Sequence, residues 1–111
     1  MNLYNFSLSN YNNQYVVVPD SETIENGTVL RSQPICTIKN PYIWSYKNGY
    51  IQHTPSGKYI SAMGDGIVNL TLQNKLENTN HQMFEINHKT GRIYKKGTDY
   101  VFDFTGGGAL T

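Results

Sequence analysis

The side chains that could carry acid–base or metal chemistry are few in this sequence. Its three histidines are His53, His81 and His88, and the last two do not have the spacing of known metal ligands. The chain lacks Gly-x-Ser-x-Gly and His-Glu-x-x-His motifs, and no phosphate-binding glycine loop precedes a Lys-Ser or Lys-Thr pair. We therefore interpret the histidines as solvent-facing turn residues, and we expect a protein that is not an enzyme and holds neither a metal nor a cofactor.

Hydrogen bonding to a neutral ligand suits the composition better. Only 15% of the 111 residues are charged, and the formal net charge is +1, whereas an average soluble domain has roughly 25% charged residues. The polar residues include nine tyrosines and many asparagines. Amides and phenols bond and stack without a charged partner, which favours a neutral ligand over a phosphate or a metal. The few basic residues are scattered, so we expect no nucleic-acid partner.

The chain shows no sign of a disulfide framework, a leader or a membrane anchor. Cys36 is the single cysteine, and we interpret it as a small buried apolar residue. Residues 1–7 lack the positive and apolar regions of a signal peptide, and no stretch approaches the roughly 18 apolar residues of a membrane span. We expect no membrane span, and a protein that is cytoplasmic or exported without a leader.

Apolar residues alternate with polar ones, which is typical of short antiparallel strands. The alternation is clear over 4–8, 68–72 and 100–104, where β-branched and aromatic residues dominate. Asn-Gly, Pro-Ser-Gly and similar turn sequences separate these runs. No amphipathic helix has start and stop signals. The sequence therefore predicts an all-β fold, and its length predicts a single domain over residues 1–111.

Several landmarks recur with a period of about 42 residues, which indicates an internal repeat. Each repeat has a tyrosine before a β-branched residue, and most have a large aromatic before a turn and an isoleucine after it. The landmarks are Tyr15, Tyr59 and Tyr100, then Trp44 and Phe84, then Ile51 and Ile93. We infer about two and a half copies of a four-strand unit, over residues 3–47, 48–89 and 90–111, the last of which is incomplete.

Repeats of this length and strand number are the plan of a β-trefoil, and their ends resemble the ricin-B-type lectin family. That family has Gln-x-Trp or Gln-x-Phe followed by Gly-x-Ile. Gln82-Met83-Phe84 with Gly91-Arg92-Ile93 is similar, whereas the first copy has Tyr42 in place of the glutamine before Trp44. The resemblance implies that Trp44 and Phe84 fill the core and that the glutamine bonds local backbone. Ile51 and Ile93 would pack on these aromatics, and Tyr59 and Tyr100 would also be structural.

The resemblance also implies a shallow sugar site in each repeat, in which an Asp accepts hydrogen bonds from two sugar hydroxyls and an aromatic stacks on the sugar. Asp103 matches that Asp, and Gly106 and Gly107 would allow close backbone approach. In the first copy Val18 occupies the position, and Asp20, with Asn26 nearby, could substitute. In the second copy Ala62 occupies the position, with Asp65 nearby. No copy has a full site, and the stacking aromatic of the Asp103 site would lie beyond Thr111.

We therefore expect a carbohydrate-binding module for neutral glycans of the galactose or N-acetylgalactosamine type, with glycans or glycoproteins as partners. A protein-binding β-trefoil, such as a protease inhibitor or a cytoskeletal cross-linker, is an open alternative, with residues 20–26 as its candidate loop. A structural fragment without independent activity is another. If the third copy is truly cut short, unpaired strand edges would be left, and strand exchange could join two chains in a homodimer.

Overall fold

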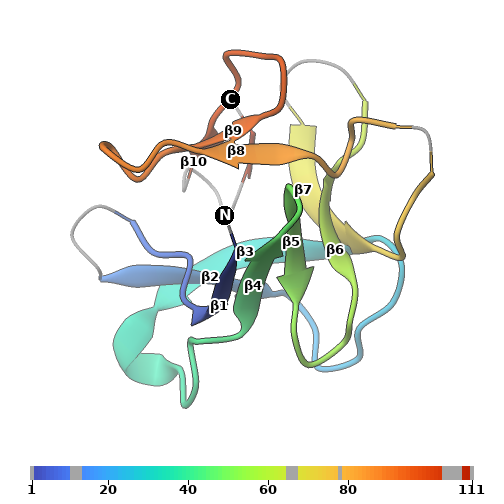
Figure 1. The fold of residues 1–111 in the computed structure, drawn as a ribbon. Coiled ribbons are helices and arrows are strands. Elements are labelled where there is room, and N and C mark those ends of the chain that lie inside the picture. Colours follow the sequence, from blue (N-terminus) through green and yellow to red (C-terminus); the bar gives the residue numbers. More distant parts are fainter. Residues whose placement is uncertain (1, 11–13, 65–67, 78, 104–108, 111) are drawn as a thin grey trace.

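The computed structural model describes residues 2–10, 14–64, 68–77, 79–103 and 109–110 (Figure 1). This part of the chain forms eleven β-strands and one short 3-10 helix, η1. The elements are β1 (Leu3–Phe6), β2 (Tyr15–Pro19), β3 (Thr28–Pro34), η1 (Ile35–Thr37), β4 (Trp44–Lys47), β5 (Tyr50–His53), β6 (Tyr59–Ala62), β7 (Val68–Gln73), β8 (Phe84–Ile86), β9 (Ile93–Lys95), β10 (Phe102–Asp103) and β11 (Ala109–Leu110).

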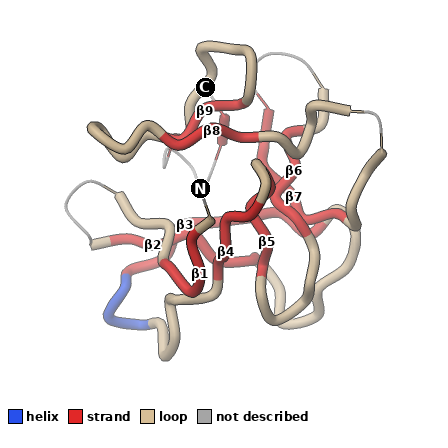
Figure 2. The backbone as a smooth tube through the Cα atoms, viewed as in Figure 1, coloured by secondary structure: helices blue, strands red, loops and turns tan. Residues whose placement is uncertain are grey.

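All strand pairs are antiparallel, which confirms the all-β prediction. The larger sheet follows the order β1-β4-β5-β6-β7-β11-β10, and the β2–β3 hairpin joins it through β3 and β7. The β8–β9 hairpin is separate and lies across the other end of the molecule (Figure 2). Within the described residues, no helix has the length and apolar character needed to cross a membrane.

Three hairpins of the same kind recur along the chain and meet at β7. They are β2–β3, β6–β7 and β10–β11, and their first strands begin at or shortly after the three landmark tyrosines. At one end of β7, Leu72 pairs with Thr28 of β3. At the other end, Asn69 pairs with Ala109 of β11. β7 therefore connects the three hairpins, although they are far apart in the sequence.

The core is built on the two large aromatics that the sequence singles out. Trp44 and Ile51 are fully buried and Phe84 is 1% exposed, which confirms the prediction for these side chains. Trp44 Nε1 donates a hydrogen bond to the Val17 carbonyl at 3.1 Å. Tyr46 Oη donates one to the Phe84 carbonyl at 2.7 Å. The buried rings thus satisfy their polar atoms while they join strands of different hairpins.

The Gly-x-Ile turns that follow these aromatics depend on glycine. Gly49 has a φ of 88° and Gly91 a φ of 75°, which is the left-handed region that side chains disfavour. A Cβ at Gly49 would lie 2.8 Å from Met83 Cε. The Gly49 carbonyl also accepts a hydrogen bond from the Phe84 N–H at 2.8 Å. The turn before β5 therefore packs directly against the start of β8.

The expectation that Tyr59 and Tyr100 are structural is only partly right, because Tyr59 is half-buried but Tyr100 is 36% exposed. The third landmark tyrosine, Tyr15, is 43% exposed. The residues that follow two of them, Val16 and Ile60, are fully buried. Because side chains alternate between the two faces of a strand, these tyrosines mark outward positions beside the core positions.

Two single-residue predictions are wrong. His53 is 5% exposed, because strand alternation places it on the same face of β5 as Ile51, where its ring packs edge-on against Trp44 at a centroid distance of 5.4 Å. Cys36 is exposed rather than buried. It lies in η1, because Pro34 ends β3 and the chain leaves the sheet there. His88 is exposed as expected, and His81 is half-buried.

The β1 edge is irregular. Among the described strands β1 pairs only with β4, and the register shifts between Leu3 and Phe6. Asn5 lies at the shift with a φ of 55°. Register shifts in edge strands discourage pairing with a second chain, because the row of edge N–H and C=O groups is interrupted. The β1 edge is therefore poorly suited to pairing with a second chain.

The glutamine of the Gln-x-Phe motif is buried and fully bonded. Gln82 Nε2 donates to the Ser61 hydroxyl and to the Asn74 carbonyl, both at 2.9 Å. Gln82 Oε1 accepts from the Leu76 N–H at 2.7 Å. This confirms the expectation that the motif glutamine bonds local backbone. One side chain thereby fixes the turn after β7 and links it to β6.

We expect Gln82→Leu to lower the free energy of unfolding by about 2–4 kcal/mol, because it removes all three hydrogen bonds of a fully buried amide, one of them to the fully buried Ser61 hydroxyl. Urea denaturation followed by the fluorescence of Trp44, the single tryptophan, measures this. The control is Gln73→Leu, which removes one contact, to the half-buried Thr71 hydroxyl, and should cost less than about 1 kcal/mol. Equal losses in both variants would contradict the structural role of Gln82.

Burial lowers the pKa of His53 below its usual 6.5, since the folded chain disfavours the charged imidazolium. The unfolded chain therefore takes up a proton first as the pH falls. The contribution of His53 to the free energy of unfolding is fully present above about pH 6.5. It decreases as the pH falls below that value and becomes constant below the folded-state pKa. Urea midpoints measured across this range should show the decline in the parent protein and a smaller decline in His53→Gln. An unchanged slope in His53→Gln, or a reduced slope in the exposed His88→Gln control, would contradict this assignment.

Candidate functional site

The candidate sugar-binding residues lie in two separate regions. Asp103 lies on β10, opposite Ala109 of β11. Asp20 and Asn26 lie in the connection between β2 and β3. In the order of paired strands, β11, β7 and β3 separate these regions. The structure therefore does not bring the predicted residues together into one site. Gly106, Gly107 and Asp65 lie outside the described residues.

The three hairpins present different residues at the position predicted to hold the sugar-binding Asp. This position is the third residue after each landmark tyrosine. Its occupants and their partners across the hairpins are Val18 opposite Arg31, Ala62 opposite Leu70, and Asp103 opposite Ala109. Val18 is 7% exposed and Ala62 is fully buried. The first two hairpins thus have only a buried aliphatic side chain there, whereas the third has an acid.

Asp20, the possible substitute in the first hairpin, already has a charged partner. Its Oδ1 lies 3.1 Å from Arg31 Nε, and both side chains are about half exposed. Its backbone N–H donates to the Val29 carbonyl at 2.9 Å, which closes the end of the hairpin. An exposed pair of this kind contributes little stability, so the carboxylate can exchange partners with a solute.

Asn26 performs a structural task at the other end of the same connection. Its Oδ1 accepts a hydrogen bond from the Asn74 N–H at 2.7 Å. The neighbouring Gly27 N–H donates to the Leu72 carbonyl at 2.8 Å. These bonds fasten the connection between β2 and β3 to the end of β7. A ligand that contacts Asn26 would use its amide nitrogen, which has no hydrogen-bond partner within the described residues.

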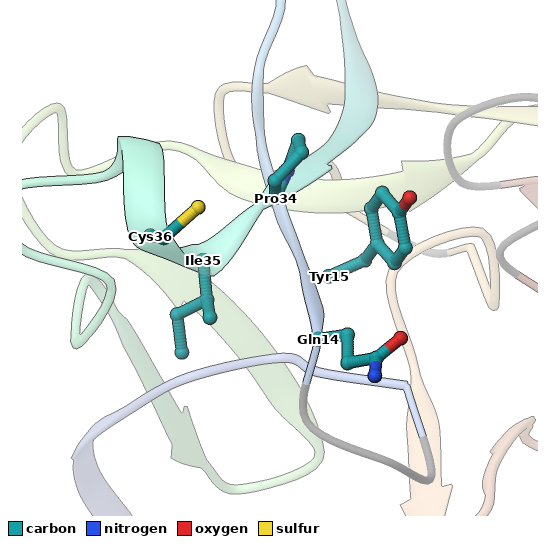
Figure 3. A pocket seen from close by; sticks show the side chains of 5 residues that line it. All are labelled: Gln14, Tyr15, Pro34, Ile35 and Cys36. Atoms are coloured by element: carbon teal, nitrogen blue, oxygen red, sulfur yellow. The ribbon is translucent and has the colours of Figure 1, made fainter.

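A shallow pocket lies at the open end of the β2–β3 hairpin, at the opposite end from Asp20. It has a volume of about 320 Å³, and it is lined by Gln14, Tyr15, Pro34, Ile35 and Cys36. In Figure 3 the Pro34 ring lies between the Cys36 sulfur and the Tyr15 ring. Tyr15 pairs with Pro34, and the Ile35 N–H donates to the Gln14 carbonyl at 2.9 Å. This pocket could not be predicted from the expectation of a buried Cys36, because the residue is exposed at its edge.

A second group of polar and aromatic side chains lies on β5, at and just before the start of β6, and in the turn after β7. Lys75 Nζ lies 4.9 Å from the centre of the Tyr50 ring. The Tyr50 ring contacts the Tyr59 ring edge-on at 5.5 Å. Lys58 Nζ donates to Asn74 Oδ1 at 2.7 Å. The sequence analysis did not single out this group, because no motif links residues at these separations.

In the described ranges, no three His, Cys, Asp or Glu side chains are grouped so that they could hold a metal ion. Comparison with known proteins found no protein-family model and no curated protein that matches the chain. The function must therefore be inferred from the geometry of the hairpins and the chemistry of their side chains.

Proposed function

We propose that the chain is a β-trefoil module of the ricin-B lectin type that binds neutral glycans with galactose- or N-acetylgalactosamine-like sugars. The fold part of this proposal draws support from the recurring hairpins. β2–β3, β6–β7 and β10–β11 follow one another at the repeat period, and β7 pairs with both β3 and β11. β4–β5 and β8–β9 recur at the same period as two further hairpins.

The motif residues behave as such a repeat requires. Trp44 and Phe84 are buried at equivalent strands, β4 and β8, and each is followed by a turn with a glycine in the left-handed region. Gln82 fixes its own repeat through three hydrogen bonds. The motif residues therefore have a structural role, because they bond and pack within the chain. Ligands would have to bind to other residues, on the surface of the hairpins.

The observation that carries the binding proposal is the position of Asp103. It occupies the hairpin position that the aliphatic Val18 and Ala62 occupy in the other two hairpins. A carboxylate cannot replace these side chains in apolar packing, so its presence calls for another role. A carboxylate accepts two hydrogen bonds from neighbouring sugar hydroxyls, which a neutral side chain does less well. The amide-rich and weakly charged composition suits the same neutral ligand.

Calorimetric titration with N-acetylgalactosamine and galactose, after a glycan array has shown which glycans bind, tests the proposal. We expect Asp103→Asn to weaken binding by about 10- to 100-fold, because a charge-assisted pair of hydrogen bonds is lost. Asp99→Asn removes the same charge from the exposed turn before β10 and should bind as the parent does. Calorimetry is preferred to fluorescence because Trp44, the single tryptophan, is fully buried, so a ligand at the surface does not contact its ring.

No binding to any glycan of this type by a folded sample would overturn the proposal. An equal loss of affinity in Asp99→Asn would overturn the role of Asp103, because it would show that net charge alone governs the interaction.

One observation favours a protein partner as a second candidate function. Residues 20–26 form an exposed loop with its own internal bonds: Ser21 Oγ donates to the Thr23 carbonyl at 2.8 Å, and the Glu25 N–H donates to Thr28 Oγ1 at 2.9 Å. A loop held in one conformation loses little entropy when it binds. A protein partner that is retained in excess galactose and released by a Glu22→Lys substitution would favour this function.

A further inference from the structure

The group on β5, around the start of β6 and in the turn after β7 forms a closed set of contacts that the proposed function does not use. We call it the Tyr50 surface, and it consists of Tyr50, Lys58, Tyr59, Asn74 and Lys75. Lys75 contacts Tyr50, Tyr50 contacts Tyr59, and Lys58, the neighbour of Tyr59, bonds Asn74, the neighbour of Lys75. Tyr50 and Tyr59 are half-buried and Lys75 is exposed, so solvent reaches the set. Figure 1 shows β5, β6 and β7 side by side.

This surface is held in place by the side chains of Asn26, which is exposed, and Gln82, which is fully buried. The Asn74 N–H donates to Asn26 Oδ1, and the Leu76 N–H donates to Gln82 Oε1, both at 2.7 Å. The Asn74 carbonyl accepts from Gln82 Nε2 at 2.9 Å. Lys75 therefore lies between two anchored residues, and little further ordering is needed when a ligand arrives.

Neither amine of the surface is neutralised within the described residues. The ion pair found there joins Arg31 to Asp20, and no carboxylate lies within 4.0 Å of either amine. Lys58 Nζ uses one of its three N–H groups, for Asn74 Oδ1. Lys75 Nζ has no hydrogen-bond acceptor there and lies over a tyrosine ring, which leaves its positive charge intact. Two fixed ammonium groups thus retain donors for an anion.

The neighbouring side chains add acceptors to these donors. Gln52 donates its amide N–H to the Gly57 carbonyl at 3.1 Å, and Gln73 donates to the Thr71 hydroxyl at 3.2 Å. Gln52 pairs with Tyr59 and Tyr59 pairs with Gln73, so the two amides flank the tyrosine on one sheet face. Their carbonyl oxygens have no donor within the described residues, and they can accept hydrogen bonds from ligand hydroxyls.

We propose that the Tyr50 surface is a second ligand site, which binds an acidic saccharide that carries sulfate or carboxylate groups. The ammonium groups of Lys58 and Lys75 pair with the anionic groups through charge-assisted hydrogen bonds. The glutamine oxygens accept from sugar hydroxyls, and the tyrosines offer ring surface to the apolar face of the sugar. A saccharide carries hydroxyl donors for the glutamine oxygens next to its anionic groups, whereas an acidic peptide has only backbone N–H donors beside side chains that accept. We therefore favour the saccharide.

This site differs from the Asp103 site in place and in chemistry. Asp103 is an acid on β10, and it would repel a sulfated sugar, whereas the Tyr50 surface is basic. The two proposals can therefore fail separately, since one depends on neutral galactose-type sugars and the other on anionic ones.

Calorimetric titration at low salt with a sulfated heparin-type tetrasaccharide, compared with the same sugar after desulfation and N-acetylation, tests the proposal. We expect the sulfated sugar to bind and the desulfated one to bind at least about tenfold more weakly. The double variant Lys58→Gln/Lys75→Gln should lose about tenfold or more in affinity, whereas Lys58→Arg/Lys75→Arg should keep most of it. Galactose binding should be the same in all these proteins.

The matched control is Lys39→Gln/Lys89→Gln, which removes the same charge from two exposed lysines outside the surface and should change affinity by less than about twofold. Circular dichroism confirms that each variant is folded. An equal loss in the control would overturn the proposal, because it would show attraction by net charge alone. No binding of the sulfated sugar would overturn it, as would tighter binding of a glutamate-rich peptide of the same charge.

Discussion

The rest of the structure depends on one buried amide, that of Gln82. Its three hydrogen bonds connect β6, the turn after β7 and the segment that leads into β8. Because the side chain is fully buried, each missing bond would leave a polar group without water, so the geometry is strongly specified. Gln82 lies two residues before the buried Phe84, and its partners Asn74 and Leu76 flank Lys75, which lies over Tyr50. The fold and the candidate ligand surface therefore share this interaction.

The sequence was sufficient to predict the parts of the fold that depend on local pattern. Alternation predicted strands, and the buried Trp44, Phe84 and Ile51 occupy the core positions that the repeat assigned to them. The role of Gln82 also followed from its motif, because a glutamine before a core aromatic can reach nearby backbone groups. The family resemblance and the sugar ligand remain proposals, since they depend on Asp103 and on chemistry that strand pairing does not reveal.

Other features required the three-dimensional structure, for reasons that differ from residue to residue. The burial of His53 had a signal, because it alternates with Ile51 on one strand face, but histidine in a turn-rich segment suggested solvent exposure. Cys36 follows Pro34, which ends β3, so the chain leaves the sheet there and the thiol lies at the surface rather than in the interior. The contact of Lys75 with a tyrosine 25 residues earlier depends on how the β6–β7 hairpin folds back, which no local pattern encodes.

The central claim is that the third hairpin binds a neutral galactose-type sugar at Asp103. A titration of isotope-labelled protein with N-acetylgalactosamine, followed by backbone amide chemical shifts in NMR spectra, tests it most directly. The account predicts that the shifted amides gather on β10 and β11, including Phe102, Asp103 and Ala109, while those of β5 and β6 stay unchanged. Saturable shifts confined to residues 20–26, or no shifts at all in a folded sample, would contradict it.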